Sequence, residues 1–84
     1  ILLQNQPNPV NQSTVFTWRL GIGCPVVLKV YDFLGREVKT LVDEVMSPGE
    51  HHVNYDASGL TPGVYFSQIR VNGIAETKKI IKLK

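Results

Sequence analysis

Residues 61–84 read TPGVYFSQIRVNGIAETKKIIKLK, and this closing stretch decides the fold. A Pro-Gly turn leads into residues 64–71, Asn72-Gly73 reverses the chain, and residues 75–84 return as a lysine-rich run. Asn-Gly between two alternating runs is a strong hairpin signal, because both central residues of a type I′ turn need positive φ. The stretch therefore predicts a terminal β-hairpin whose last strand carries basic side chains.

The rest of the chain consists of short alternating runs separated by turn residues. The predicted strands are residues 14–20, 26–31, 36–42 and 50–55, with a bulge or an early strand end near Thr40. Residues 32–35 (DFLG) suit a type I turn, whereas Ser47-Pro48-Gly49 and Thr61-Pro62-Gly63 suit type II turns. Helical periodicity is absent. This pattern predicts an all-β protein with six or seven strands in two packed sheets.

The N-terminal arm, residues 1–13, reads ILLQNQPNPVNQS. Its prolines predict an extended segment that does not join a central ladder, because proline lacks a backbone N–H. We interpret the Pro-Asn-Pro at 7–9 as a rigid lead into the sandwich, in which the Asn8 side chain caps a local turn.

Alternation within each run also predicts the core and the orientation of the last strand. The last strand places Ile81 and Leu83 on the same face as Lys79, and Lys78, Ile80, Lys82 and Lys84 on the other. The candidate core residues are Phe16, Trp18, Leu20, Leu28, Val30, Val38, Val53, Tyr65, Ile69 and Ile81. Trp18 is expected to contribute most, because it has the largest apolar surface to bury.

Composition limits the function classes. Eighty-four residues form one domain, and no apolar run is long enough to span a bilayer. A net charge of +2 does not indicate a nucleic-acid partner. Cys24 has no partner for an internal disulfide and is interpreted as a small buried hydrophobe. Because the sequence starts at Ile1 without Met, we expect it to be a piece of a longer protein.

Candidate catalytic and metal-binding residues do not combine into a site. His51 and His52 are neighbours on one predicted strand, so their side chains point to opposite faces and cannot share a metal ion. Asp43 and Glu44 are expected in a solvated loop without the further oxygens that calcium requires. No Gly-x-Ser-x-Gly elbow or phosphate-binding loop is present. We therefore expect a non-catalytic protein without metal or cofactor.

Three segments resemble a known family. QNQPNPVNQST near the start, LKVYDFLGREVKTLVD in the middle and SPGEHHVNYDASGLTPGVYFSQIRVNG…TKKIIKLK at the end resemble the type A C-terminal sorting domain of the type IX (Por) secretion system. They are also similar to the Ig-like domain of flagellar hook-capping proteins. The resemblance implies an Ig-like antiparallel β-sandwich of about seven short strands. It implies a non-catalytic signal that directs an upstream cargo domain through the periplasm and outer membrane of a Gram-negative bacterium to the cell surface or medium.

The resemblance also implies which residues the secretion machinery recognises. In the family they are a Gly-x-Tyr segment and a terminal Lys-rich strand. Carried over, the candidate recognition residues are Gly63, Val64, Tyr65, Lys78, Lys79, Ile80, Ile81, Lys82, Leu83 and Lys84. A protein partner could contact the terminal strand along its edge or through its side chains.

Two other functions compete with sorting. One is a structural Ig-like accessory module, as a spacer or in a hook-capping protein. The other is carbohydrate binding, for which the candidate aromatic residues are Tyr31, Phe33, Tyr55 and Phe66. Taken without the resemblance, the terminal lysines favour protection of an edge strand over docking of a receptor. We expect a monomer in which that edge could pair with a second copy.

Overall fold

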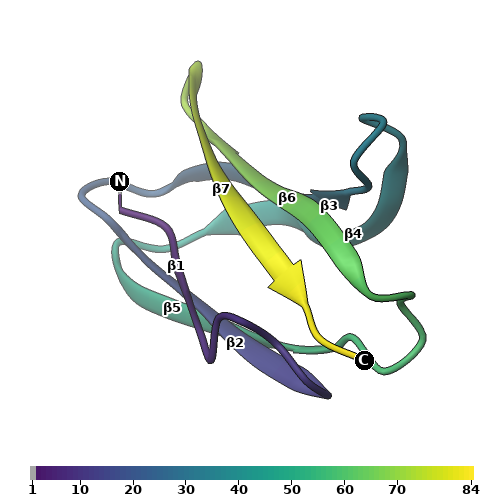
Figure 1. The fold of residues 1–84 in the computed structure, drawn as a ribbon. Helices are drawn as coiled ribbons and strands as arrows, with labels where there is room; N and C mark the ends of the chain where they lie inside the picture. The colour runs from purple at the N-terminus through teal and green to yellow at the C-terminus, as the bar shows by residue number, and fades with distance from the viewer. Residues whose placement is uncertain (1) are drawn as a thin grey trace.

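The computed structural model describes residues 2–84, which form seven strands and no helix (Figure 1). The strands are β1 (Gln4–Gln6), β2 (Ser13–Leu20), β3 (Cys24–Tyr31), β4 (Glu37–Met46), β5 (Gly49–Asp56), β6 (Gly63–Val71) and β7 (Ile74–Lys82). They build an antiparallel three-stranded sheet, β1-β2-β5, and an antiparallel four-stranded sheet, β4-β3-β6-β7. No helix that could cross a membrane occurs in this part of the chain.

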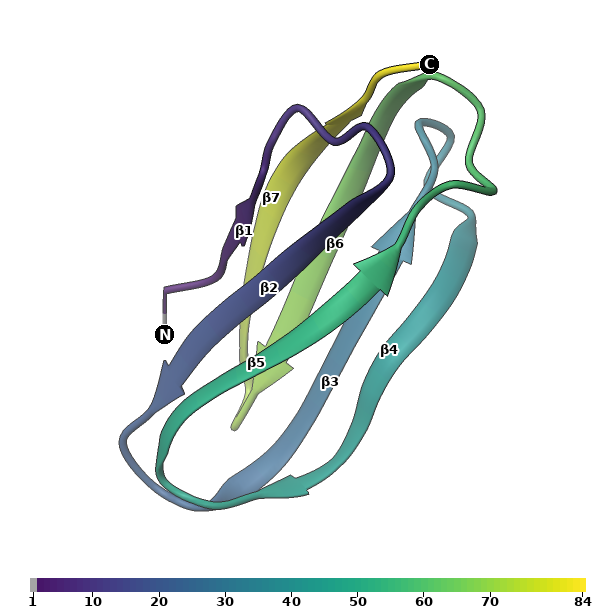
Figure 2. The same cartoon turned by 90° about the horizontal axis from the view of Figure 1, so that it is seen from below.

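The two sheets pack face to face and enclose the core (Figure 2). Alternate residues of β2 point inward, so that Phe16, Trp18 and Leu20 are buried. Leu28 and Val30 of β3 and Tyr65 and Ile69 of β6 meet them from the other sheet. These seven residues were predicted in the core. The predicted all-β fold, an antiparallel sandwich of about seven short strands, is thus confirmed.

Three predicted core residues behave differently. Val53 is only half-buried, although it packs against the core. Val38 and Ile81 are 38% and 37% exposed, so their assignment to the core was wrong. For Val38 and Ile81, the sequence pattern indicated the wrong face of the strand. A shift of one residue along a strand moves a side chain to the opposite face of the sheet.

The β6–β7 hairpin closes through the turn that the sequence predicts. Asn72 and Gly73 have φ angles of 51° and 82°, as a type I′ turn requires. With these two residues between the strands, Val71 pairs with Ile74, and eight more residue pairs follow without interruption down to Gly63 and Lys82. The register of the terminal strand is therefore fixed by the turn.

The β3–β4 hairpin is irregular. Register shifts between Leu28 and Lys29 and between Val30 and Tyr31 leave Leu41 and Val38 of β4 without direct partners. The first shift confirms the bulge predicted near Thr40, and the second explains why Val38 is exposed. The prediction that Asp43 and Glu44 lie in a loop was wrong, because β4 continues past the bulges to Met46.

The N-terminal arm connects the two sheets. β1 pairs with the edge of β2, so the arm stays out of the central ladders as predicted. Beyond β1 the chain crosses to the other sheet, where Val10 forms a parallel bridge with Lys82. Leu3 and Val10 are both fully buried, which anchors the arm at two points. The crossing places the arm beside β7 (Figures 1 and 2).

Candidate functional site

All ten candidate recognition residues lie at one end of the β6–β7 hairpin. Gly63 is the register partner of Lys82, Val64 of Ile81, and Tyr65 of Ile80. Lys78 and Lys79 continue the strand, and Leu83 and Lys84 follow it. Two segments that are separated in the sequence therefore form one continuous piece of sheet. β7 is the edge strand of the four-stranded sheet, as the sequence predicts.

The Gly-x-Tyr segment has a local structural cause. Gly63 has a φ of 146°, a conformation that residues with a Cβ rarely adopt. Tyr65 is buried, and its hydroxyl donates a hydrogen bond to the carbonyl of Thr61 at 2.7 Å, four residues upstream. Glycine therefore permits the bend into β6, and the tyrosine ties the preceding loop to the sheet.

The inner face of β7 differs from the prediction. Ile80 and Lys82 are 3% and 4% exposed and point toward the core, whereas Ile81 faces outward. The predicted orientation was therefore wrong, because the turn pairs Ile80 with the buried Tyr65, and register partners share a face. The Lys82 ammonium group donates to the carbonyls of Leu83 at 2.7 Å and Lys84 at 3.2 Å, which compensates for its burial.

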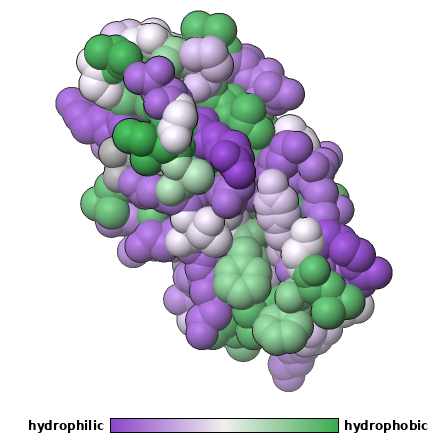
Figure 3. Space-filling model, turned by 90° about the horizontal axis from the view of Figure 1, so that it is seen from above, coloured by the Kyte–Doolittle hydropathy of each residue, from purple (hydrophilic) through white to green (hydrophobic). Residues whose placement is uncertain are grey.

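The remaining recognition residues are accessible. Lys79 and Ile81 lie on the outer face of the sheet, where Val64 is half-buried beside Ile81. Lys78, Leu83 and Lys84 are exposed. Figure 3 looks onto this outer face and shows apolar side chains next to hydrophilic ones. The ten residues thus divide into a buried group and a group that a partner can touch.

Sequence reasoning missed the contribution of the arm. The Asn8 side chain does not cap a local turn; it bonds to Lys79 and Ile81 on β7. The backbone of Val10 bonds to Ile81 and Leu83. No short-range signal could have revealed these contacts, because they join residues more than 70 positions apart.

Two carboxylates with lowered pKa values, Asp32 and Glu37, lie on the β3–β4 hairpin. The backbone N–H of Arg36 donates to Asp32 at 2.9 Å and lowers the pKa of Asp32, and the Arg36 guanidinium and the Leu34 N–H act in the same direction. The hydrogen bond from Lys29, 2.9 Å long, lowers the pKa of Glu37 and raises that of Lys29. These groups stabilise the β3–β4 turn region and do not face the terminal strand.

The histidines occupy opposite faces of β5, as their sequence positions predict. The half-buried His51 ring stacks on Trp18 with 5.9 Å between ring centroids, and its Nε2 lies 2.7 Å from the Ser47 carbonyl. His52 is exposed. Cys24 is buried at the start of β3, as expected of a small hydrophobe.

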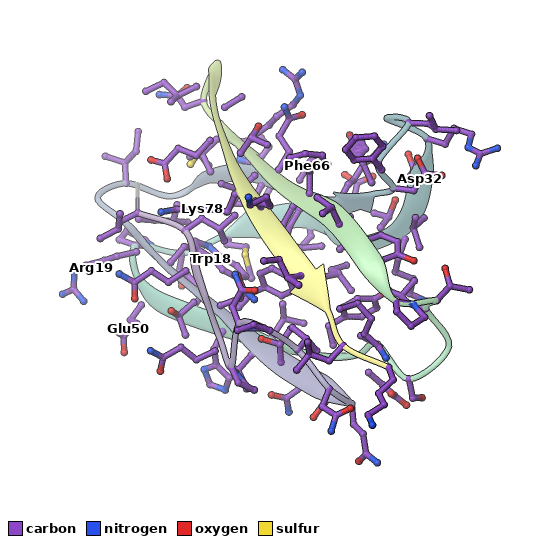
Figure 4. The ribbon with its side chains drawn as sticks, in the orientation of Figure 1. Trp18, Arg19, Asp32, Glu50, Phe66 and Lys78 are labelled. Atoms are coloured by element: carbon purple, nitrogen blue, oxygen red, sulfur yellow. The ribbon has the colours of Figure 1, made fainter. Side chains whose placement is uncertain are left out.

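The aromatic residues considered for carbohydrate binding are dispersed. Tyr55 is buried against Phe16 and was wrongly placed among the accessible candidates. Tyr31 and Phe66 are register partners on the outer face, both half-buried, and Phe33 is exposed on the β3–β4 turn. Figure 4 shows Phe66 and Trp18 on opposite sides of the four-stranded sheet.

Comparison with known proteins assigns the chain to a family. No curated protein matches the chain. A family model described as "Secretion system C-terminal sorting domain" matches residues 6–83, which include β2 to β7 and nine of the ten candidate recognition residues. The family consists of type IX secretion signals and is not known to catalyse a reaction. Such a signal interacts with secretion machinery and is carried by proteins exported to the cell surface or the medium. The chain belongs to the type IX secretion C-terminal sorting domain family.

Proposed function

We propose that the outer-membrane secretion machinery binds this domain through the outer face of the β6–β7 end. The observation that carries the proposal is the pairing register of β6 and β7. It places Val64 of β6 beside Ile81 of β7, and Lys79 shares the outer face of that edge strand with Ile81. Residues 1–84 act as one Ig-like domain at the end of a longer protein, and the cargo domain precedes it. The cargo crosses the periplasm and then the outer membrane with this domain attached.

The candidate recognition residues have two separate roles in this proposal. Gly63, Tyr65, Ile80 and Lys82 hold the hairpin end in shape, because they are buried or adopt a backbone conformation specific to glycine. The side chains that touch the machinery are Val64, Lys79 and Ile81 on the outer face, together with the exposed Leu83 and Lys84 that follow the strand; Lys78 is exposed but shares the opposite face with Ile80. An apolar centre with ammonium groups around it suits a partner surface that has an apolar pocket and carboxylates at its rim.

Deletion of residues 80–84 tests the function itself. A reporter protein that carries this domain at its C-terminus, expressed in a Gram-negative bacterium with a type IX system, is expected to reach the medium. The deletion is expected to trap it in the periplasm. Export of the truncated reporter at the normal rate would rule out the sorting role for this chain.

A double substitution separates recognition from folding, because the deletion also removes the buried Ile80. The variant K79E/I81S changes two outer-face residues and leaves the core intact. Its matched control is K39E/V38S on the other edge strand, where Val38 is 38% exposed and Ile81 is 37% exposed. Loss of two central contacts costs on the order of 2 kcal/mol or more, so export should fall roughly tenfold or more. Equal export of the two variants would exclude the outer face as the contact surface.

A further inference from the structure

We propose that the N-terminal arm is a built-in cover for the edge of β7, and that Asn8 is the residue that positions the recognition strand. This inference rests on the proposed function of the β6–β7 end. It makes the signal discontinuous, because residues near the start of the domain fix the strand near its end. It also identifies how the partner reads the strand, namely by side chains and not by strand addition.

The arm forms hydrogen bonds along the free edge of β7, from the Lys79 carbonyl to the Leu83 N–H. Asn8 Nδ2 donates to the Lys79 carbonyl at 3.0 Å, and Asn8 Oδ1 accepts from the Ile81 N–H at 3.1 Å. Next, the Val10 N–H donates to the Ile81 carbonyl at 2.7 Å, and the Val10 carbonyl accepts from the Leu83 N–H at 2.7 Å. At this end of β7, four edge groups that a partner strand would need, from the Lys79 carbonyl to the Leu83 N–H, are therefore already bonded.

The Asn8 side chain supplies the hydrogen-bond donor that the backbone of its two neighbours lacks. Pro7 and Pro9 flank it, and proline has no N–H to donate to a ladder. A primary amide offers the same donor and acceptor as a peptide group, so the Asn8 side chain occupies the place of a paired residue. An ionised carboxylate of the same size offers the acceptor but not the donor.

The arm is held in place independently of these bonds. Leu3 and Val10 are fully buried, and the Leu3 N–H donates to a Glu76 carboxylate oxygen at 3.0 Å. The buried Thr14 hydroxyl donates to the Pro7 carbonyl at 3.0 Å and accepts from the Asn5 amide at 3.2 Å. Asn8 is thus presented to β7 from a fixed support. A partner strand would have to displace the whole arm to reach this edge.

The first test is Asn8→Leu, with Asn11→Leu as a matched control in the same arm. Asn11 is exposed and makes no side-chain hydrogen bond to the residues described. Hydrogen exchange of the folded domain should show the protection of the Ile81 amide falling roughly threefold to tenfold in N8L, the range expected for one hydrogen bond. Protection in N11L should equal that of the wild type. Unchanged Ile81 protection in N8L would overturn the proposal.

A second variant, Asn8→Asp, distinguishes hydrogen bonding from space filling. At neutral pH the carboxylate can accept from the Ile81 N–H, but it faces the Lys79 carbonyl without a proton to donate. Once protonated, the acid both donates and accepts, as the amide does. The Ile81 protection factor, which corrects for the intrinsic rate, should therefore rise in N8D as the pH falls toward 4. A role in packing alone predicts no such dependence, and its absence would overturn the proposal.

Export separates this inference from the proposed function. The reporter fused to N8L should be exported less than the one fused to N11L. If N8L is exported normally while K79E/I81S is not, the positioning role is wrong and the recognition surface stands. If K79E/I81S is exported normally, the recognition surface itself is wrong, whatever the result for N8L.

Discussion

The two hairpins of the four-stranded sheet present its two edges in different ways. β4, on one side, departs from its partner at two bulges and carries charged side chains from Glu37 to Glu44. β7, on the other side, keeps nine continuous pairs with β6 and is covered by the N-terminal arm. Bulges and charges discourage any strand from pairing, whereas a specific cover also fixes which residues face outward.

The difference shows what a recognised strand requires. A bulge changes which side chains face outward, whereas uninterrupted pairing keeps the strict alternation of faces along a strand. β7 carries the family's terminal segment, and its phase is fixed both by the Asn72-Gly73 turn and by the arm. In the sequence analysis, edge protection and receptor docking are alternative roles for the terminal strand. In this arrangement β7 can have both roles.

The largest effect is expected from the pair Ile80→Ala and Ile81→Ala. Ile80 is 3% exposed, so its truncation leaves a cavity and should lower the free energy of unfolding by about 2–5 kcal/mol. Ile81 is 37% exposed and should cost about 1 kcal/mol. Urea unfolding of both variants measures the difference. Equal losses would mean that β7 has no distinct inner and outer face.

A smaller loss of stability is expected from Gly63→Ala. The φ of 146° strains a residue with a Cβ, although no atom stands in its way, so the cost should be about 1–3 kcal/mol. Gly21→Ala is the control, because Gly21 also has free space around its Cβ position and needs no such φ. Thermal unfolding should place G63A well below G21A, and equal midpoints would contradict the backbone explanation of this glycine.

Lowering the pH is expected to weaken the hydrogen bonds of the β3–β4 turn locally. Hydrogen bonds from Arg36 and Leu34 hold the pKa of Asp32 below its ordinary value of 3.8. This contribution to stability is fully present above pH 3.8 and is lost as the pH falls through the lowered native pKa. Nuclear magnetic resonance should show the Leu34 and Arg36 amides losing protection in that range. The Asn72-Gly73 turn has no titratable side chain and should not respond there, which serves as the internal control.

The smallest effect is expected at the uncovered edge. Val45 is 74% exposed on β4, so Val45→Lys should change the free energy of unfolding by no more than about 0.5 kcal/mol. An added lysine also suits an edge strand. A large loss in calorimetry would show that β4 packs against something and would remove the contrast between the two edges.

Much of the fold follows from short-range patterns. Phe16, Trp18 and Leu20 alternate cleanly, and Asn72-Gly73 forces a reversal, so this strand and this turn appear in the structure as predicted. The prediction of which face of β7 points inward was wrong. Lysines lie on both faces of this strand, so the two faces do not differ clearly in hydropathy. Counting pairs outward from the two-residue turn would have matched Tyr65 with Ile80.

Other features depend on distant parts of the chain. The second bulge, which exposes Val38, arises from how β4 fits β3 and leaves no mark in the local sequence. The bond from Asn8 to Ile81 requires both sheets to be assembled. For the candidate site, the sequence therefore indicated the segments, and the structure was needed to separate the buried residues from the accessible ones.

The single tryptophan gives the domain a built-in optical reporter. Trp18 is 2% exposed, stacks on His51, and its indole N–H has no hydrogen-bond partner among residues 2–84. Such an indole fluoresces at short wavelength and shifts to the red when water reaches it. Emission spectra of each variant would therefore show, without a label, whether lost export reflects an opened sandwich or an intact domain that is no longer recognised.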